Sequence, residues 1–70
     1  MKWDDIELRW PDLRQRALVH WFHLTAEDVN QMTGKREELI ECVRERYKFP
    51  REQAEKEVDA WAFFLPKTEL

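Results

Sequence analysis

The 70-residue sequence contains no serine, one cysteine and one glycine, and each shortage excludes a class of site. Without serine, a Ser-His-Asp nucleophile cannot be assembled. A single glycine cannot build the Gly-rich loop that cradles phosphates. The lone Cys42 cannot form an intrachain disulfide, which is typical of a protein in a reducing compartment.

Long apolar runs and a dominant charge are also missing. No stretch approaches the roughly 20 apolar residues that span a bilayer, and the first residues are acidic, unlike a signal peptide. The net charge of −3 is spread along the chain, so it predicts neither a nucleic-acid nor a membrane partner. We therefore expect a cytoplasmic protein.

The residues that are present indicate one all-α domain, residues 1–70. With 43% hydrophobic and 39% charged residues, the chain has the composition of a soluble helical domain. At this length a domain is near the lower size limit for folding without a disulfide or a metal, so its large side chains are interpreted first as core. No strand-like alternation of useful length appears.

The first predicted helix has Pro11 in its first turn, where a missing N–H costs nothing. Its apolar residues are spaced by three and four, which puts them on one face; they are Trp10, Leu13, Ala17, Trp21 and Leu24. Residues 4–9 are interpreted as a kinked lead-in to this helix, with a separate short helical turn as the alternative.

Three further helices are predicted along the chain. Thr25 can cap a short second helix, with Asp28 at the capping-box position and Gly34 as a left-handed cap behind it. The third helix covers residues 35–47 and ends before Pro50. The fourth begins near Pro50 and stops at Pro66; its apolar face contains Ala54, Val58, Trp61 and Leu65. Four helices joined by short turns predict two helical hairpins.

The sequence contains few residues in patterns suited to catalysis or metal binding. Cys42 could pair with His20 or His23 as a nucleophile, but a small residue at the edge of a helix is the favoured interpretation. The two histidines are spaced i, i+3, yet no third metal ligand lies nearby in the sequence. Glu37, Glu41 and Glu45 lie on one polar face, which indicates a solvated surface. We expect no catalytic, cofactor-binding or metal-binding residues.

Two segments suggest a partner surface. In residues 44–51, the cations Arg44, Arg46, Lys48 and Arg51 surround two aromatics, a composition typical of phosphate-and-base recognition. Helix-dipole stabilisation and core packing explain the same residues, and the acidic net charge disfavours nucleic acid.

The second segment is apolar. Residues 61–65 cannot all face a small core from one helix, so some of Phe63, Phe64 and Leu65 should be exposed or covered by another chain. Phe22, beside Trp21, raises the same question. This surface is a candidate for self-association or for an unknown protein partner; wrapping over the domain's own core is the alternative.

The order of several residues resembles the CsbD-like family of small bacterial general stress-response proteins. The resemblance covers residues 1–61 without gaps and leaves residues 62–70 as a C-terminal extension. It is carried by Ile6, Trp10, Leu13, Trp21, Leu24-Thr25-x-x-Asp28, Gly34-Lys35-Arg36-x-x-Leu39, Glu45-Arg46-Tyr47 and Ala54-Glu55-Lys56-x-Val58-Asp59-x-Trp61.

The resemblance implies a non-enzymatic cytoplasmic protein with two crossed helical hairpins, as in SAM-like domains, and with no assigned molecular activity. Several positions that are often glycine in the family are larger here; they are Leu8, Gln15, Phe22, Glu41 and Lys48. The change at Lys48 removes a helix-capping glycine, and Phe49-Pro50 is expected to end the helix instead. Trp3 lies outside the shared pattern and is expected to be exposed.

Overall fold

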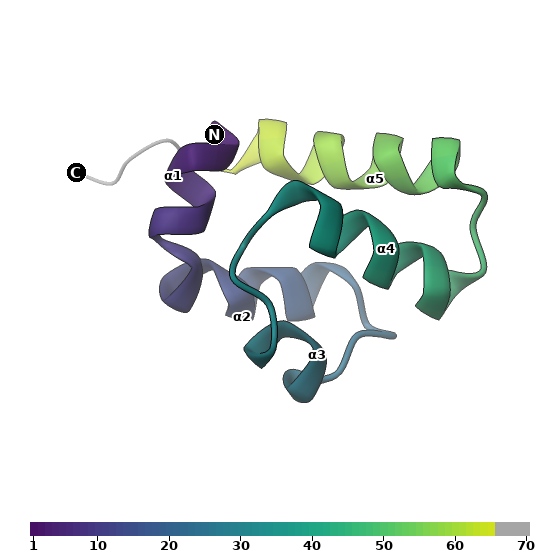
Figure 1. The fold of residues 1–70 in the computed structure, drawn as a ribbon, viewed down its shortest axis with the longest axis horizontal. Helices are drawn as coiled ribbons and strands as arrows, with labels where there is room; N and C mark the ends of the chain where they lie inside the picture. Colours follow the sequence, from purple (N-terminus) through teal and green to yellow (C-terminus); the bar gives the residue numbers. More distant parts are fainter. Residues whose placement is uncertain (66–70) are drawn as a thin grey trace.

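The computed structural model describes residues 1–65. Over this range the chain is all-α, as predicted, and contains no strand. It has five helices (Figure 1), which are α1 (Trp3–Leu8), α2 (Trp10–His20), α3 (Ala26–Asn30), α4 (Arg36–Tyr47) and α5 (Arg51–Phe64). The predicted stop at Pro66 lies outside the described residues.

The prediction of four helices is wrong because the segment before Arg9 forms a helix of its own. Pro11 has no N–H to donate to the carbonyl of Glu7, and its ring would clash with that carbonyl in a continuous helix. The chain therefore turns at Arg9, and α2 begins at Trp10 with Pro11 in its first turn. Arg9 is bonded to both helices: its N–H donates to the Asp5 carbonyl of α1 at 3.0 Å, and its carbonyl accepts from Leu13 N–H of α2 at 3.1 Å.

The first predicted helix is also too long at its C-terminal end. Helix α2 ends at His20, and Trp21 is extended with φ −116° and ψ 96°. Trp21 and Leu24 are nevertheless buried. Their spacing correctly indicated that they belong to the core, but the loop after α2 brings them there instead of a helix.

Helix α3 begins as predicted. Asp28 N–H donates to Thr25 Oγ1 at 3.1 Å, and Thr25 N–H donates to Asp28 Oδ2 at 3.0 Å, which completes the capping box. Its end differs from the prediction, because the C-cap is Gln31 and not Gly34.

Gly34 does have the expected positive φ, of 96°, but it serves the packing of α1 on the loop that precedes α4. A Cβ at this position would lie 2.9 Å from Glu7 Cα and 3.0 Å from Trp10 Cβ. Next to it, Glu38 Oε1 accepts the N–H groups of Thr33, Gly34 and Lys35 at 2.8, 3.1 and 3.1 Å. Burial would raise the pKa of Glu38, but these hydrogen bonds together lower it.

Helices α4 and α5 form a hairpin and run side by side (Figure 1). Lys48 ends α4 in the left-handed conformation, with φ 59° and ψ 37°. The expectation that Phe49-Pro50 replaces a capping glycine is therefore incomplete, because Lys48 itself adopts the conformation that glycine favours. The predicted apolar face of α5 is buried throughout, including Leu65 beyond its end.

Four tryptophans meet at the centre of the domain. The ring centroid of Trp61 lies 5.2 Å from that of Trp21, 6.4 Å from that of Trp3 and 6.5 Å from that of Trp10. Trp10 Nε1 donates to the Val29 carbonyl at 3.0 Å. Trp3 is half-buried against the core, so the expectation of an exposed Trp3 is wrong.

Replacing Trp61 by Ala should lower the free energy of unfolding by about 3–5 kcal/mol, because it removes the side chain that contacts the other three indoles. Urea unfolding followed by far-UV circular dichroism measures this loss. Trp3→Ala is the matched control and should cost clearly less, since Trp3 is half-buried. Equal losses for the two variants would contradict the central place of Trp61.

Replacing Lys48 by Gly should raise the free energy of unfolding by about 0.5–1 kcal/mol, since relief of the left-handed conformation outweighs the added chain entropy. Glu45→Gly, within α4, should lower it by about 0.5–1 kcal/mol. The same urea titration compares the two. A loss of stability in Lys48→Gly would show that Lys48 is not strained.

Candidate functional site

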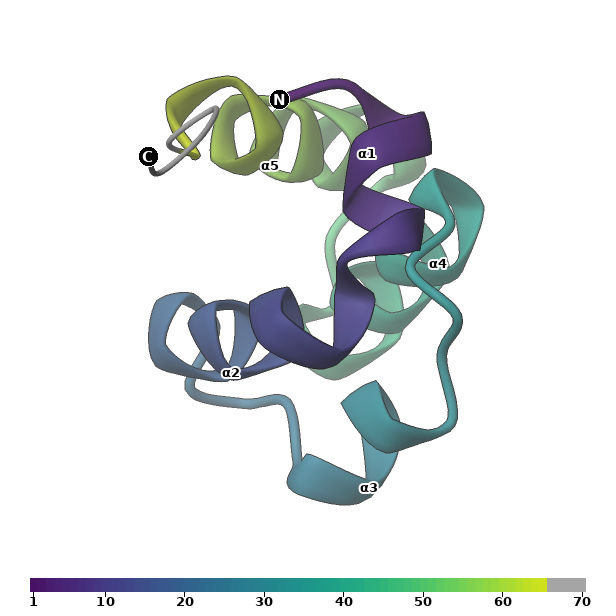
Figure 2. The ribbon, with the colours of Figure 1, turned by 90° about the vertical axis from the view of Figure 1, so that its left-hand side faces the viewer.

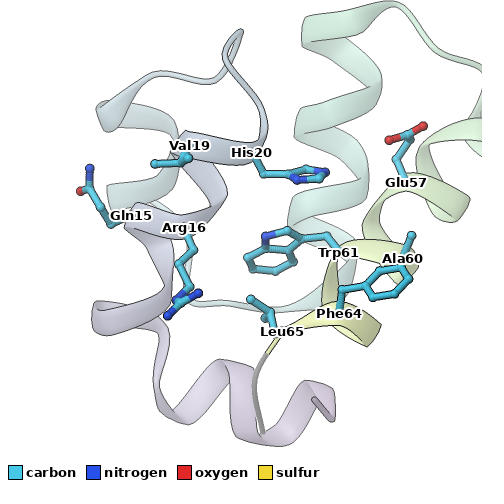
Figure 3. Close-up of a pocket in the computed structure, with 9 residues that line it drawn as sticks. All are labelled: Gln15, Arg16, Val19, His20, Glu57, Ala60, Trp61, Phe64 and Leu65. Carbon is cyan, nitrogen blue, oxygen red and sulfur yellow. The ribbon is translucent and has the colours of Figure 1, made fainter. Parts of the chain in front are cut away.

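A groove of about 680 Å³ lies between α2 and α5. Figure 2 views α2 and α5 nearly end-on, and Figure 3 draws the side chains that line the groove. We call it the α2–α5 groove. It is lined by Gln15, Arg16, Val19 and His20 of α2, by Glu57, Ala60, Trp61 and Phe64 of α5, and by Leu65.

The lining of the groove is predominantly apolar. Trp61 and Leu65 are buried and form part of the core as well as of the groove. Val19 and Phe64, in contrast, are 65% and 79% exposed. The rings of His20 and Trp61 point toward one another between the two helices (Figure 3). The groove therefore offers solvent-accessible apolar surface next to the tryptophan core.

The polar groups of the groove are divided between its walls. Arg16 lies on the α2 wall and Glu57 on the α5 wall. Neither forms an ion pair within residues 1–65, and Glu57 only accepts a hydrogen bond from Gln53 Nε2 at 3.0 Å. One wall thus presents a cation and the other an anion to whatever lies over the groove.

Of the three phenylalanines singled out from the sequence, Phe64 alone lines this groove. Phe63 and Phe64 are 76% and 79% exposed, and their rings contact edge to face with centroids 5.2 Å apart. Phe22 is also exposed but does not line the groove. Leu65 is buried, so it lines the floor of the groove and presents no exposed side chain to a partner.

Sequence reasoning missed the α2 side of the groove. Val19 was not singled out, because a lone valine beside polar residues carries no signal for a partner surface. Its role emerges only from the position of α2 relative to α5, which depends on contacts between residues far apart in the sequence. An exposed apolar residue off the core stripe of α2 is the one signal that could have indicated it.

The four cations of residues 44–51 lie near the α4–α5 turn, but three are engaged by carboxylates. Arg46 forms a bidentate pair with Asp28, with Nε–Oδ2 at 2.9 Å and Nη2–Oδ1 at 2.7 Å. Arg51 contacts Glu37 at 2.7 Å, Glu55 at 2.8 Å and Glu41 at 3.2 Å. Arg44 contacts Glu41 at 3.3 Å, and Lys48 is the left-handed C-cap. A phosphate would have to compete with these carboxylates.

The two aromatics of that segment pack within the domain. Tyr47 and Phe49 stack with ring centroids 5.3 Å apart, and Tyr47 Oη accepts from His23 N–H at 3.2 Å. Both side chains are half-buried against the core. They are therefore less available for stacking on bases than freely exposed rings.

Reactive groups are not concentrated anywhere in the described chain. Burial raises the pKa of the Cys42 thiol to about 11, so the thiolate is scarce at neutral pH. His20 packs against Trp21 and His23 against Tyr47. Within residues 1–65 no three His, Cys, Asp or Glu side chains cluster as metal ligands. None of the described helices is both long and apolar enough to cross a bilayer.

Several bacterial proteins have sequences similar to this chain. The chain is 36% identical over 61 residues to the UPF0337 protein YjbJ of Escherichia coli O6:H1, an alignment covering 87% of this chain and 88% of the relative. It is 32% identical over 62 residues to a UPF0337 protein of Nitrosomonas europaea, covering 89% and 66%. No family model and no solved structure matches the chain. The chain belongs to the UPF0337 family.

The ion pair of Asp28 predicts a loss of stability in acid. The hydrogen bond from Arg46 holds the pKa of Asp28 below its ordinary value of 3.8. The unfolded chain therefore takes up the proton first as the pH falls, so this contribution is present above about pH 4 and disappears through the lower folded pKa. Asp28→Asn should be less stable than wild type at pH 7.

The difference in the free energy of unfolding between wild type and Asp28→Asn should narrow steadily from pH 5 to pH 2, as measured by urea unfolding at each pH. Glu45→Gln, an exposed carboxylate without an ion pair within the described residues, should follow the wild-type pH profile. A stability gap for Asp28→Asn that stays constant in acid would contradict the ion-pair account.

Proposed function

We propose that this member of the UPF0337 family is a non-enzymatic, cytoplasmic general stress-response protein of the CsbD-like type, and that it acts by binding another polypeptide chain in the α2–α5 groove. The observation that carries the binding role is the juxtaposition of a concave apolar surface with the exposed aromatic side chain of Phe64 on its rim. Large apolar patches on small soluble proteins usually mark interaction sites.

The energetics of a small domain favour this interpretation. Phe63 and Phe64 occupy the last turn of α5 without contributing to the buried core. A chain near the lower size limit for folding has little apolar surface to bury, and these two large aromatic side chains do not contribute to that burial. A partner chain that covers them recovers the free energy of burial, and an aromatic anchor in a concave site is a common source of binding energy.

The stress-response part of the proposal is supported by the CsbD-like order of residues in the sequence. The names of the bacterial relatives state no activity. The same resemblance implies two crossed hairpins in a SAM-like arrangement; the α4–α5 hairpin is consistent with one of them. A non-enzymatic role agrees with a single cysteine whose pKa is raised to about 11.

Binding of nucleic acid through Arg44, Arg46, Lys48 and Arg51 has less support. Three of these side chains already pair with carboxylates of the same chain. Affinity for nucleic acid depends on neutralising several phosphates, and a paired guanidinium must first give up its partner. Binding of a polypeptide in the α2–α5 groove does not require one of these ion pairs to break.

The proposal is tested in the native host by deleting the gene and restoring it as variants. We expect the protein to accumulate several-fold under osmotic or starvation stress, as measured by quantitative mass spectrometry. The deletion strain should survive the stress less well, and wild type should restore survival. Phe64→Glu, at equal protein level, should not.

Phe22→Glu is the matched control, since it changes an equally exposed phenylalanine that does not line the groove. It should restore survival. Unchanged abundance under stress, or a deletion strain with normal survival, would contradict the stress-response role. Full rescue by Phe64→Glu would contradict the role of the groove.

A further inference from the structure

We infer that the occupant of the α2–α5 groove is a second copy of this chain, paired about a two-fold axis so that α2 of each copy lies on α5 of the other. This inference rests on the proposed function, because it identifies the partner of the same groove. In such an isologous contact, both copies use the same surface patch. The following features make the groove self-complementary.

The first feature is that the apolar anchor and its receiving surface lie side by side in one chain. Phe63 and Phe64 project from the end of α5, and Phe64 itself borders the groove. The opposite wall presents Val19, which is 65% exposed. A two-fold axis through the groove places the Phe64 ring of each copy over the α2 wall of the other, so both sets of apolar surface are covered at once.

The second feature is the charge on the two walls. Helix α2 carries two arginines and one aspartate, whereas α5 carries four carboxylates and two cations. At the groove, the α2 wall presents Arg16 and the α5 wall presents Glu57, and neither has an ion-pair partner within residues 1–65. Crossing α2 of one copy over α5 of the other brings the two together twice, once at each end of the contact.

The third feature is the area available. An aromatic side chain buries roughly 150–250 Å², so the four exposed phenylalanines of two copies amount to roughly 600–1,000 Å². Stable interfaces bury about 1,200–2,000 Å². The pairing therefore lies at the weak end, and we expect a dissociation constant on the order of 100 µM.

The test is sedimentation equilibrium of the full chain at low ionic strength, from about 10 µM to about 2 mM, a range that brackets the expected dissociation constant. The average mass should rise from the 8.7 kDa of one chain toward twice that value. Phe64→Glu should stay at the mass of one chain throughout. Phe22→Glu should associate like wild type. Circular dichroism establishes that each variant is folded.

A charge exchange tests the crossing of the two helices. Arg16→Glu and Glu57→Arg, each alone, should weaken the pairing at least about tenfold, because each places like charges together at both ends of the contact. An equimolar mixture of the two variants should associate like wild type, since every contact then joins opposite charges. Rescue by mixing requires that α2 of one chain contact α5 of another.

A chain that remains monomeric up to the highest concentration, or two charge variants that fail to pair when mixed, would overturn the inference. Loss of association in Phe22→Glu but not in Phe64→Glu would overturn it as well, by placing the contact elsewhere. If the chain is monomeric and Phe64→Glu still fails to restore survival, only self-pairing is wrong. If Phe64→Glu restores survival, the proposed function fails too.

Discussion

The packing of Trp61 against three other indoles is the interaction on which the rest of this domain depends. Trp3 belongs to α1, Trp10 to α2 and Trp21 to the loop that follows, and all three lie within 6.5 Å of Trp61, centroid to centroid. In a chain with one glycine and no disulfide, this cluster joins α5 to the N-terminal helices. A large aromatic side chain buries enough area to stabilise such a small core.

The same side chain connects the fold to the candidate site. Trp61 is 5% exposed, so it is a core residue, yet its ring also lines the α2–α5 groove. The tryptophan cluster sets the distance between α2 and α5 and therefore the width of the groove. One turn further along α5, Leu65 stays in the core whereas Phe64 is exposed on the rim. The site is thus a place where the buried core borders exposed apolar side chains of α2 and α5.

Much of the fold could be predicted from local patterns. The Thr25–Asp28 capping box, the apolar stripe of α5 and the burial of Trp10 and Trp21 follow from spacing and side-chain chemistry alone. For residues 4–9 the favoured interpretation, a kinked lead-in, was wrong and the alternative of a separate helical turn was right, because the effect of Pro11 on the preceding turn was given too little weight. The burial of Trp3 and the place of Gly34 against α1 could not be predicted, because both depend on how distant helices meet.

The candidate site, like the fold, could be predicted from the sequence only in part. Exposure of Phe63 and Phe64 was foreseeable, since five consecutive apolar residues cannot share one helix face. The α2 wall, with Arg16 and Val19, was not, because it belongs to the site only through tertiary structure. The pairing of Arg46 with Asp28, 18 positions apart, was equally invisible and lowers the support for a phosphate-binding surface.

The central claim is that the working surface of this protein is the α2–α5 groove and that a second copy fills it. NMR amide and methyl shifts recorded on dilution from about 2 mM to about 20 µM, across the expected dissociation constant, test it most directly. The account predicts concentration-dependent shifts at Arg16, Val19, Ala60 and Phe64. Shifts confined to residues 44–51, or spectra that do not change on dilution, would contradict it.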